Sequence, residues 1–361
     1  MYEERLYELD ILRVLGTFII VFHHLPDYVG NFYNFNYFGI PINLSYINVL
    51  NTYFGLGIFV FVSGFVLYHT CPKIDSILSF LKKRVVRIFP LYLVAIALFA
   101  LTLRRLSLSE TLIHILGLQI LLAPKFVVPM PTLWFVGLIV TLYSFYAFLA
   151  RYARDSLGIV SFSLVVFGLF YLIRHFLLIV EYRFFLYFFI FLAGIICRRA
   201  RLFSRYDFGA SHIFIAVLIS FASVVVFRSF HEGPIYECGG VTEAFISQAS
   251  IAEIFTVSTA VDTMMLTVIF IAFTLAKKLK KCLNKTVTRF LSSVSFSSYG
   301  IYLFHRPILD VITKASRFLF PHHSYWRLFS GVMFGLPLVF ALSYIAQASS
   351  NKIVERLRNL A

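Results

Sequence analysis

The chain has 361 residues, of which 60% are hydrophobic and only 14% are charged, and its mean hydropathy is +0.85. Soluble globular domains carry about 45–50% apolar and about 25% charged residues, so this composition excludes soluble, disordered, collagen-like and disulfide-scaffold proteins. The formal net charge of +15 then indicates Lys- and Arg-rich cytoplasmic loops of a membrane protein, and we expect no nucleic-acid partner.

Hydropathy divides the chain into apolar segments of the length that a membrane span needs, which is about 20 residues. In chain order the ten predicted spans are 9–26, 52–71, 88–105, 132–150, 157–174, 183–197, 210–228, 258–276, 291–312 and 327–348. A shorter segment at 111–122 is predicted to be re-entrant or interfacial. We therefore predict an all-α, polytopic transmembrane helix bundle that forms a single domain over residues 1–361, with no soluble domain.

The distribution of Lys and Arg predicts the orientation of these spans. If 111–122 does not cross the membrane, most basic residues fall in cytoplasmic loops, as the positive-inside rule requires, whereas a crossing there would move the majority outside. The loop at 229–257 contains four glutamates and neither Lys nor Arg, which favours an outside position. We expect a protein of the cell membrane with both termini in the cytoplasm.

The first span contains ionisable residues, which are rare in the hydrocarbon core and often functional. Arg13 and His24 are eleven residues apart, so their directions around a helix differ by only about 20° and their positions along its axis by about 16 Å. Asp10 lies three residues before Arg13, near the same stripe, and is predicted to orient it. On spacing alone, Arg13 and His24 could equally anchor the helix at the two membrane surfaces.

An Arg, ten intervening residues and a His in the first span resemble the signature of the acyltransferase-3 family, integral-membrane enzymes that acylate surface sugars. Further landmarks of that family follow in order: GLGIFVFVSGF at 55–65, RVVRIFPLY at 84–92, TLWFVGLIVTLYSFY at 132–146 and SVSFSSYGIYLFHRPIL at 293–309. The chain departs from many members in two places. Many members have an acidic residue a few positions after the tryptophan, whereas none lies between Trp134 and Tyr146, and many have Asp or another non-glycine residue where this chain has Gly57. No role is therefore assigned to the carboxylate that relatives carry.

The resemblance implies a membrane O-acyltransferase that moves an acyl group, for which we expect acetyl, from cytoplasmic acyl-CoA to a hydroxyl of a cell-surface carbohydrate or glycolipid. His24 would be the general base that removes the hydroxyl proton, because neutral imidazole suits this task near pH 7. Alternatively, it would accept the acyl group covalently. Arg13 would hold the pantetheine or phosphate end of the donor. No metal is expected, and the sequence does not indicate an oligomeric state.

The remaining candidate residues are divided between the donor and the acceptor. Arg84 and Arg87 are predicted to bind the phosphates of CoA, together with Ser63 at the donor site, because guanidinium groups bind phosphate bidentately. Both arginines could instead anchor the third span to lipid headgroups. The residues assigned to the acceptor side or cavity are Trp134, Tyr299, Tyr302 and His305. The alternative function is a transporter or flippase for a lipid-linked or acylated substrate, since intramembrane Arg and His suit a substrate path equally.

Overall fold

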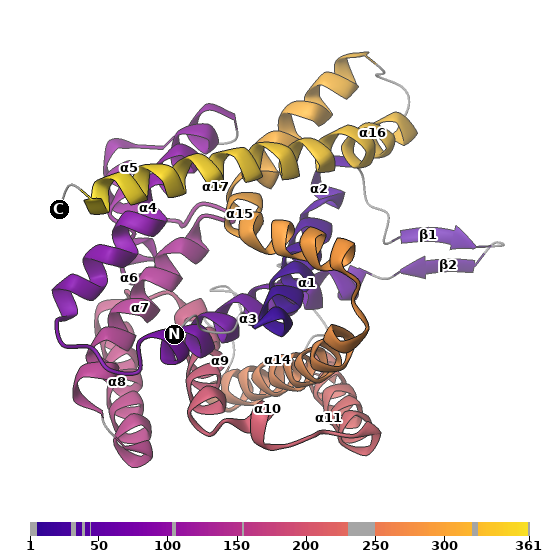
Figure 1. The fold of residues 1–361 in the computed structure, drawn as a ribbon. Coiled ribbons are helices and arrows are strands. Elements are labelled where there is room, and N and C mark those ends of the chain that lie inside the picture. Colours follow the sequence, from indigo (N-terminus) through magenta and orange to yellow (C-terminus); the bar gives the residue numbers. More distant parts are fainter. Residues whose placement is uncertain are drawn as a thin grey trace. The chain divides into compact units, whose positions relative to one another are not determined.

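The computed structural model describes residues 6–29, 34–37, 40–43, 45–102, 106–153, 155–229, 250–319 and 324–359. These residues are almost entirely helical, which confirms the predicted all-α class (Figure 1). A small antiparallel hairpin of β1 (Asn34–Tyr37) and β2 (Ile40–Asn43), in which Asn34 lies opposite Asn43, is the exception. Most of the predicted outer loop at 229–257 falls outside the described residues.

Each predicted span corresponds to a helix. In chain order these are α1 (Tyr7–His24), α3 (Ser45–Thr70), α4 (Ile77–Thr102), α7 (Trp134–Tyr152), α8 (Ser156–Leu177), α9 (Tyr182–Arg199), α11 (Ala210–Ser229), α14 (Ile251–Leu279), α15 (Lys285–Leu319) and α17 (Leu336–Asn359). The short helices α2 (Pro26–Val29) and α10 (Leu202–Arg205) follow α1 and α9. Before α17 lie α16 (Ser324–Ser330) and a π-helical turn, Gly331–Gly335.

Within the described residues, seven helices are long and apolar enough to cross a membrane, by length and composition. They are Tyr53–Thr70, Ile77–Thr102, Trp134–Tyr152, Ser156–Leu177, Ala210–Ser229, Ile251–Cys282 and Trp326–Arg356. The three other predicted spans lie in α1, α9 and α15, which all contain charged side chains. The chain is thus a membrane protein of apolar helices, and the total of ten spans stays a prediction.

The segment at 111–122 does not form one spanning helix. It is divided between α5 (Leu108–Ile115) and α6 (Gln119–Leu122). A capping box starts α5: the Ser107 hydroxyl accepts a hydrogen bond from the Glu110 backbone N–H, and the Glu110 carboxylate accepts one from the Ser107 N–H. Eight residues of helix rise only about 12 Å, far less than the roughly 30 Å of a hydrocarbon core. This agrees with the re-entrant or interfacial prediction.

The chain divides into two compact units. The first comprises Met1–Leu56, Arg87–Leu106 and Ala276–Ala361, and the second comprises Gly57–Val86 and Ser107–Leu275. Both α3 and α4 contribute residues to both units. The single domain that the sequence predicts over residues 1–361 stays a prediction.

In the first unit, α1 and α15 run in the same direction. Asp10 and His24 of α1 contact Ser295 and His305 of α15, in the same order along both helices. Along this contact, buried apolar residues of α1, the turn after it, α2 and α15 form one cluster with Val339 of α17. Its members are Val14, Val21, Leu25, Tyr28, Val294, Ile301, Leu309 and Val339. Val14 and Val21 on α1 are seven residues apart, as are Val294 and Ile301 on α15, and this spacing places each pair on one face of its helix.

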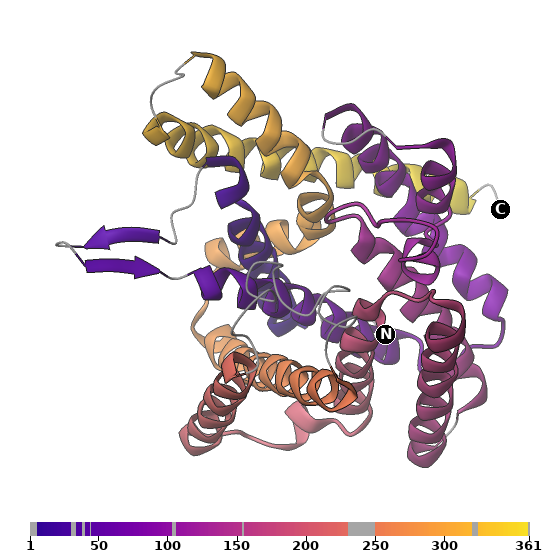
Figure 2. The same cartoon turned by 180° about the vertical axis from the view of Figure 1, so that it is seen from behind.

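Two further helices of this unit can be oriented by their contacts with α15. The carbonyls of Ile88 and Thr102 in α4 accept hydrogen bonds from Tyr299 and Lys314, so α4 runs parallel to α15. By contrast, α17 lies beside α15 (Figures 1 and 2) and runs antiparallel to it, because Gly300 lies against Ser343 whereas Leu309 lies against Gly335, just before α17. Gly300 permits this approach, because a Cβ there would lie 2.9 Å from the carbonyl oxygen of Ser343.

In the second unit, two glycines bring the backbones of α3 and α9 into direct contact. A Cβ at Gly64 of α3 would lie 2.2 Å from the carbonyl oxygen of Phe191 in α9. A Cβ at Gly194 of α9 would lie 2.2 Å from the carbonyl oxygen of Phe61 in α3. Small residues allow membrane helices to approach so closely. The glycine of the Ser63-Gly64-Phe65 landmark is therefore required by helix packing.

Candidate functional site

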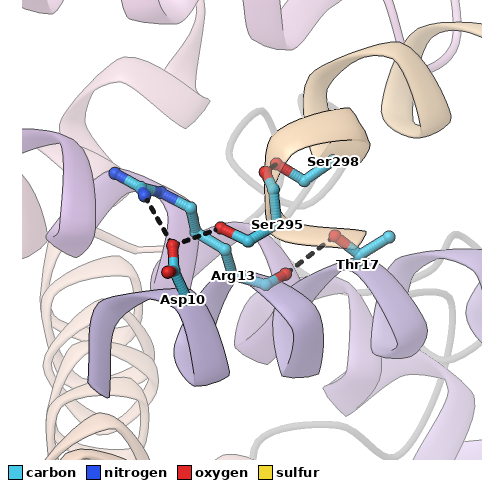
Figure 3. Close-up of polar contacts among 5 residues, drawn as sticks. All are labelled: Asp10, Arg13, Thr17, Ser295 and Ser298. Carbon is cyan, nitrogen blue, oxygen red and sulfur yellow. Dashed lines mark hydrogen bonds and ion pairs between the residues drawn. The ribbon is translucent and has the colours of Figure 1, made fainter. Parts of the chain in front are cut away.

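A buried carboxylate joins the N-terminal parts of α1 and α15 in the first unit. Asp10 is 4% exposed, and its Oδ1 accepts a hydrogen bond from the Ser295 hydroxyl at 2.6 Å. The same oxygen lies 3.5 Å from Nη1 of Arg13 (Figure 3). The Arg13 side chain remains 30% exposed, so its guanidinium can still reach an anionic ligand. Asp10 thus lies where it can orient Arg13, and α15 holds it there.

Two of the three hydroxyl groups near this carboxylate donate to backbone carbonyls. Thr17 donates to the carbonyl oxygen of Arg13 at 2.7 Å, and Ser298 donates to that of Ser295 at 2.8 Å (Figure 3). Both bonds stay within one helix. Of the three hydroxyls in Figure 3, Ser295 alone donates to Asp10, which makes it the link between α1 and α15 at this level.

At the other end of α1, two imidazole rings stack. The ring centroids of His24 and His305 lie 5.3 Å apart with an interplanar angle of 21°. His305 is fully buried, and its Nδ1 lies 2.8 Å from the carbonyl oxygen of Tyr302 and 3.1 Å from that of Ile301. Because a carbonyl only accepts, these contacts assign the proton to Nδ1 and the lone pair to Nε2.

The Nε2 atom of His305 is a buried acceptor that receives no donor from the described part of the chain. A buried acceptor left unpaired costs about 1–3 kcal/mol, so a ligand hydroxyl that donates to it would be stabilised there. The structure therefore places a second imidazole, ready to accept a hydrogen bond, beside His24.

An ion pair lies next to His24. Nδ1 of His24 is 3.7 Å from Oδ2 of Asp27, and Nη2 of Arg306 is 2.7 Å from the same oxygen. Arg306 also donates through Nε to the Tyr28 hydroxyl at 3.1 Å. Burial raises the pKa of Tyr28 above its ordinary value, although the neighbouring Arg306 guanidinium acts in the opposite direction. Tyr28 therefore stays neutral and can accept this bond.

Asp27 and Tyr28 are site residues that the sequence did not reveal. Both residues follow the first predicted span and lie outside the stripe of Asp10, Arg13 and His24 that its helical spacing predicts. The i,i+3 spacing of His24 and Asp27 was the available signal, because a carboxylate one turn from a histidine can orient its ring. The partners of Arg306, Asp27 and Tyr28, come from the other end of the sequence.

In the second unit, the predicted acceptor residue Trp134 is buried at the start of α7. The Arg183 guanidinium stacks over its ring at 4.0 Å from the centroid, which is a cation–π contact. Arg183 also forms an ion pair with Glu181. The face of the indole ring toward Arg183 is thus already occupied, and a sugar could stack on it only by displacing the guanidinium.

The predicted donor-binding arginines lie farther from the N-terminal end of their helix, α4, than expected. The third span was predicted at 88–105, just after Arg84 and Arg87, but α4 begins at Ile77, about two turns before Arg84. Hydropathy missed those turns because their lysines and arginines are polar, although such side chains can extend to the interface from a continuous helix. Arg87 is exposed, and Ser63 of α3 is half-buried.

Arg84 is packed against aromatic rings of its own unit. Its guanidinium carbon lies 4.9 Å from the Phe80 centroid and 5.8 Å from the Tyr143 centroid. Nη2 is 3.9 Å from the Cys71 sulfur, and no described residue accepts a hydrogen bond from the buried Nε. Arg84 is therefore largely enclosed by protein, which is unlike a side chain that only anchors a helix to headgroups.

The structure brings six of the predicted site residues together on α1 and α15. They are Asp10, Arg13, His24, Tyr299, Tyr302 and His305. Tyr302 lies with its ring centroid 6.2 Å from that of His305, whereas Tyr299 donates its hydroxyl proton to the carbonyl of Ile88 in α4. Ser63, Arg84 and Trp134 belong to the second unit. Among the described residues, no three His, Cys, Asp or Glu side chains are grouped as a metal site would require.

The chain matches the model of a protein family. The model of the acyltransferase-3 family, described as an acyltransferase domain, matches residues 6–348. This stretch is nearly the whole chain and includes every site residue described above. No curated protein and no solved structure matches the chain.

Proposed function

The chain belongs to the acyltransferase-3 family, and on that premise we propose that it is an O-acyltransferase of the cell membrane. The proposed donor is cytoplasmic acyl-CoA, with acetyl as the acyl group. The proposed acceptor is a hydroxyl of a cell-surface carbohydrate or glycolipid. The observation that carries this proposal is the imidazole pair of His24 and His305 beside the Asp27–Arg306 ion pair.

In the proposed reaction, His24 removes the proton of the acceptor hydroxyl while the hydroxyl oxygen attacks the thioester carbonyl carbon. The carbon–sulfur bond then breaks, and the CoA thiolate leaves and takes up a proton. Asp27 would stabilise a proton on Nδ1 of His24, so that Nε2 serves as the base. The Nε2 atom of His305 would accept a hydrogen bond from a neighbouring hydroxyl of the acceptor and so orient it.

A second route uses the same residues. His24 attacks the thioester, CoA leaves, and the acyl group passes from the imidazole to the acceptor hydroxyl. In both routes Arg13 would hold the donor about 16 Å from His24 along the helix axis. That separation suits the extended pantetheine arm between the thioester and the phosphates.

The directions of the helices in the first unit support the proposed topology. Because α1, α4 and α15 run parallel, an odd number of crossings must separate α4 from α15. If α7, α8, α9, α11 and α14 each cross once, that condition is met, whereas a further crossing at 111–122 would violate it. This parity supports ten spans with both termini on the same side of the membrane, which the distribution of Lys and Arg predicts to be the cytoplasm.

The proposal is tested with purified protein in detergent, acetyl-CoA labelled on the acetyl group, and a panel of surface-carbohydrate and glycolipid acceptors. We expect label bound covalently to an acceptor, released only by ester hydrolysis. In liposomes, transport of a lipid-linked or acylated substrate with no covalent transfer would instead identify the transporter or flippase.

The Asp27→Asn variant is expected to lower kcat by about ten- to a hundredfold, because a misplaced catalytic group costs up to about that much. The KM for acyl-CoA should stay unchanged, since Asp27 lies beside the proposed base. Initial rates over a range of acyl-CoA concentrations measure both quantities. Asp27→Glu should recover part of the rate, and Glu355→Gln, which removes an exposed carboxylate of α17, should leave it unchanged. An unaltered kcat in Asp27→Asn contradicts the positioning role.

A further inference from the structure

A cavity of about 370 Å³ lies in the second unit, where the ends of α3, α7 and α9 meet the α3–α4 connection. This volume is within the range of small-ligand sites. The polar side chains that line it are Tyr68, Lys73, Asp75, Tyr146, Arg151 and Arg199. None of them was assigned to the site above, and the lining includes neither Arg84 nor Arg87.

The cavity carries uncompensated positive charge. Three of its lining residues, Lys73, Arg151 and Arg199, are cationic, and Asp75 is its single carboxylate. Within the described part of the chain, Asp75 forms no ion pair with them, and the Lys73 ammonium has no polar partner. Arg151 makes one long contact, 3.5 Å from Nη1 to the carbonyl oxygen of Ile74. An anion entering the cavity would therefore meet cations that are not already neutralised.

Arg199 is held in place by neutral partners, which leaves its charge available. Its Nε donates to the Ser156 hydroxyl at 3.0 Å, and its Nη1 donates to the Tyr68 hydroxyl at 2.8 Å. Because the Tyr68 oxygen is the acceptor, its own proton can be donated to a ligand. No described residue accepts a hydrogen bond from Nη2 of Arg199. The cavity thus presents a fixed guanidinium and a phenol as donors to the same anion.

We propose that this cavity is a binding site for the phosphate groups of an organic phosphate. Guanidinium binds phosphate through two parallel hydrogen bonds, ammonium adds a point charge, and both are strengthened by the charge of the anion. Asp75 accepts a hydrogen bond from a hydroxyl next to the phosphate. All three cations come from loops or helix ends that the positive-inside rule places in the cytoplasm.

Two kinds of ligand carry such phosphate groups at the cytoplasmic face of a membrane. One is the phosphorylated nucleotide end of acyl-CoA, an assignment that rests on the proposed function. The other is the headgroup of an anionic phospholipid, which does not. The cavity binds phosphate in either case.

The test uses the full-length protein in neutral detergent, with coenzyme A titrated in the absence of any acceptor and phosphatidylglycerol retention measured by native mass spectrometry. The variants are Lys73→Gln, Arg199→Gln and their combination. Arg205→Gln is the matched control, because it removes an exposed arginine of α10 that does not line the cavity. Each lost charged hydrogen bond should weaken binding by about tenfold or more. Lys73→Gln removes no contact of the described protein, so it tests the proposal even if Arg199→Gln fails to fold.

A loss of coenzyme A affinity in the cavity variants, with lipid retention unchanged, identifies the nucleotide as the ligand. A loss of phosphatidylglycerol retention, with coenzyme A affinity unchanged, identifies the lipid headgroup. If Lys73→Gln alters neither, the cavity is not a phosphate site. These outcomes are separate from acyl transfer: a wild-type protein that binds either ligand here but transfers no acyl group refutes the proposed function and leaves the site in place.

Discussion

Replacing His24 by alanine is expected to reduce acyl transfer by at least about a hundredfold, since a positioned general base contributes about 10²–10⁴ in rate. Both proposed routes need this imidazole, either as base or as nucleophile. Arg13, some 16 Å away along α1, stays in place, so the affinity for acyl-CoA should change little. Transfer of labelled acetyl and equilibrium binding of acyl-CoA measure the two effects separately.

His175→Ala is the matched control for this variant, because it removes an exposed histidine of α8 that belongs to the second unit. It should transfer acetyl at the wild-type rate. Full transfer by His24→Ala would exclude both routes. To separate them, wild-type protein is quenched after mixing with labelled acyl-CoA and no acceptor. Label that stays on the protein and is lost in His24→Ala indicates the covalent route.

The second large effect concerns the crossing of α3 and α9. Gly194→Ala is expected to destabilise the protein by at least about 2 kcal/mol, because overpacking typically costs 1–3 kcal/mol. The new Cβ would lie 2.2 Å from the Phe61 carbonyl oxygen and 2.9 Å from the Phe65 nitrogen. Both are backbone atoms, so no side chain can rotate away and α3 and α9 must separate. Thermal unfolding in detergent measures the loss.

The control for this substitution is Gly168→Ala in α8. A Cβ there would meet nothing within 4 Å, and alanine favours a helix over glycine by up to about 1 kcal/mol. The control should therefore be as stable as the wild type or slightly more stable. A Gly194→Ala variant that unfolds at the same temperature as Gly168→Ala would show that the two backbones are not in contact.

The sequence predicted the helices well because each apolar run is a local signal. The helix ends were predicted less well, since hydropathy detects the hydrocarbon core and not the polar turns beyond it. Thus α4 begins at Ile77 rather than near residue 88, and α14 begins at Ile251 rather than near 258. The hairpin of β1 and β2 was not predicted.

Within the site, the stripe of Asp10, Arg13 and His24 follows from helix geometry alone, and α1 is one continuous helix over all three. Their partners could not be predicted. Ser295 is one of several serines in its span, and nothing in its local sequence marks it as the one that donates to Asp10. The same is true of Arg306, whose partner Asp27 lies 279 residues away in the chain.

The hydrogen bond between Asp10 and Ser295 also has a consequence for the order in which the protein is synthesised and assembled. Its two residues are 285 positions apart, and ribosomes add about 5–20 residues per second. The first helix therefore waits on the order of 15–60 seconds for the helix that satisfies its carboxylate. During that time Asp10 has the guanidinium of Arg13 on its own helix but not yet the hydroxyl of Ser295. The assembly of this site is thus one of the last events in the synthesis of the chain, although its central residues are among the first to leave the ribosome.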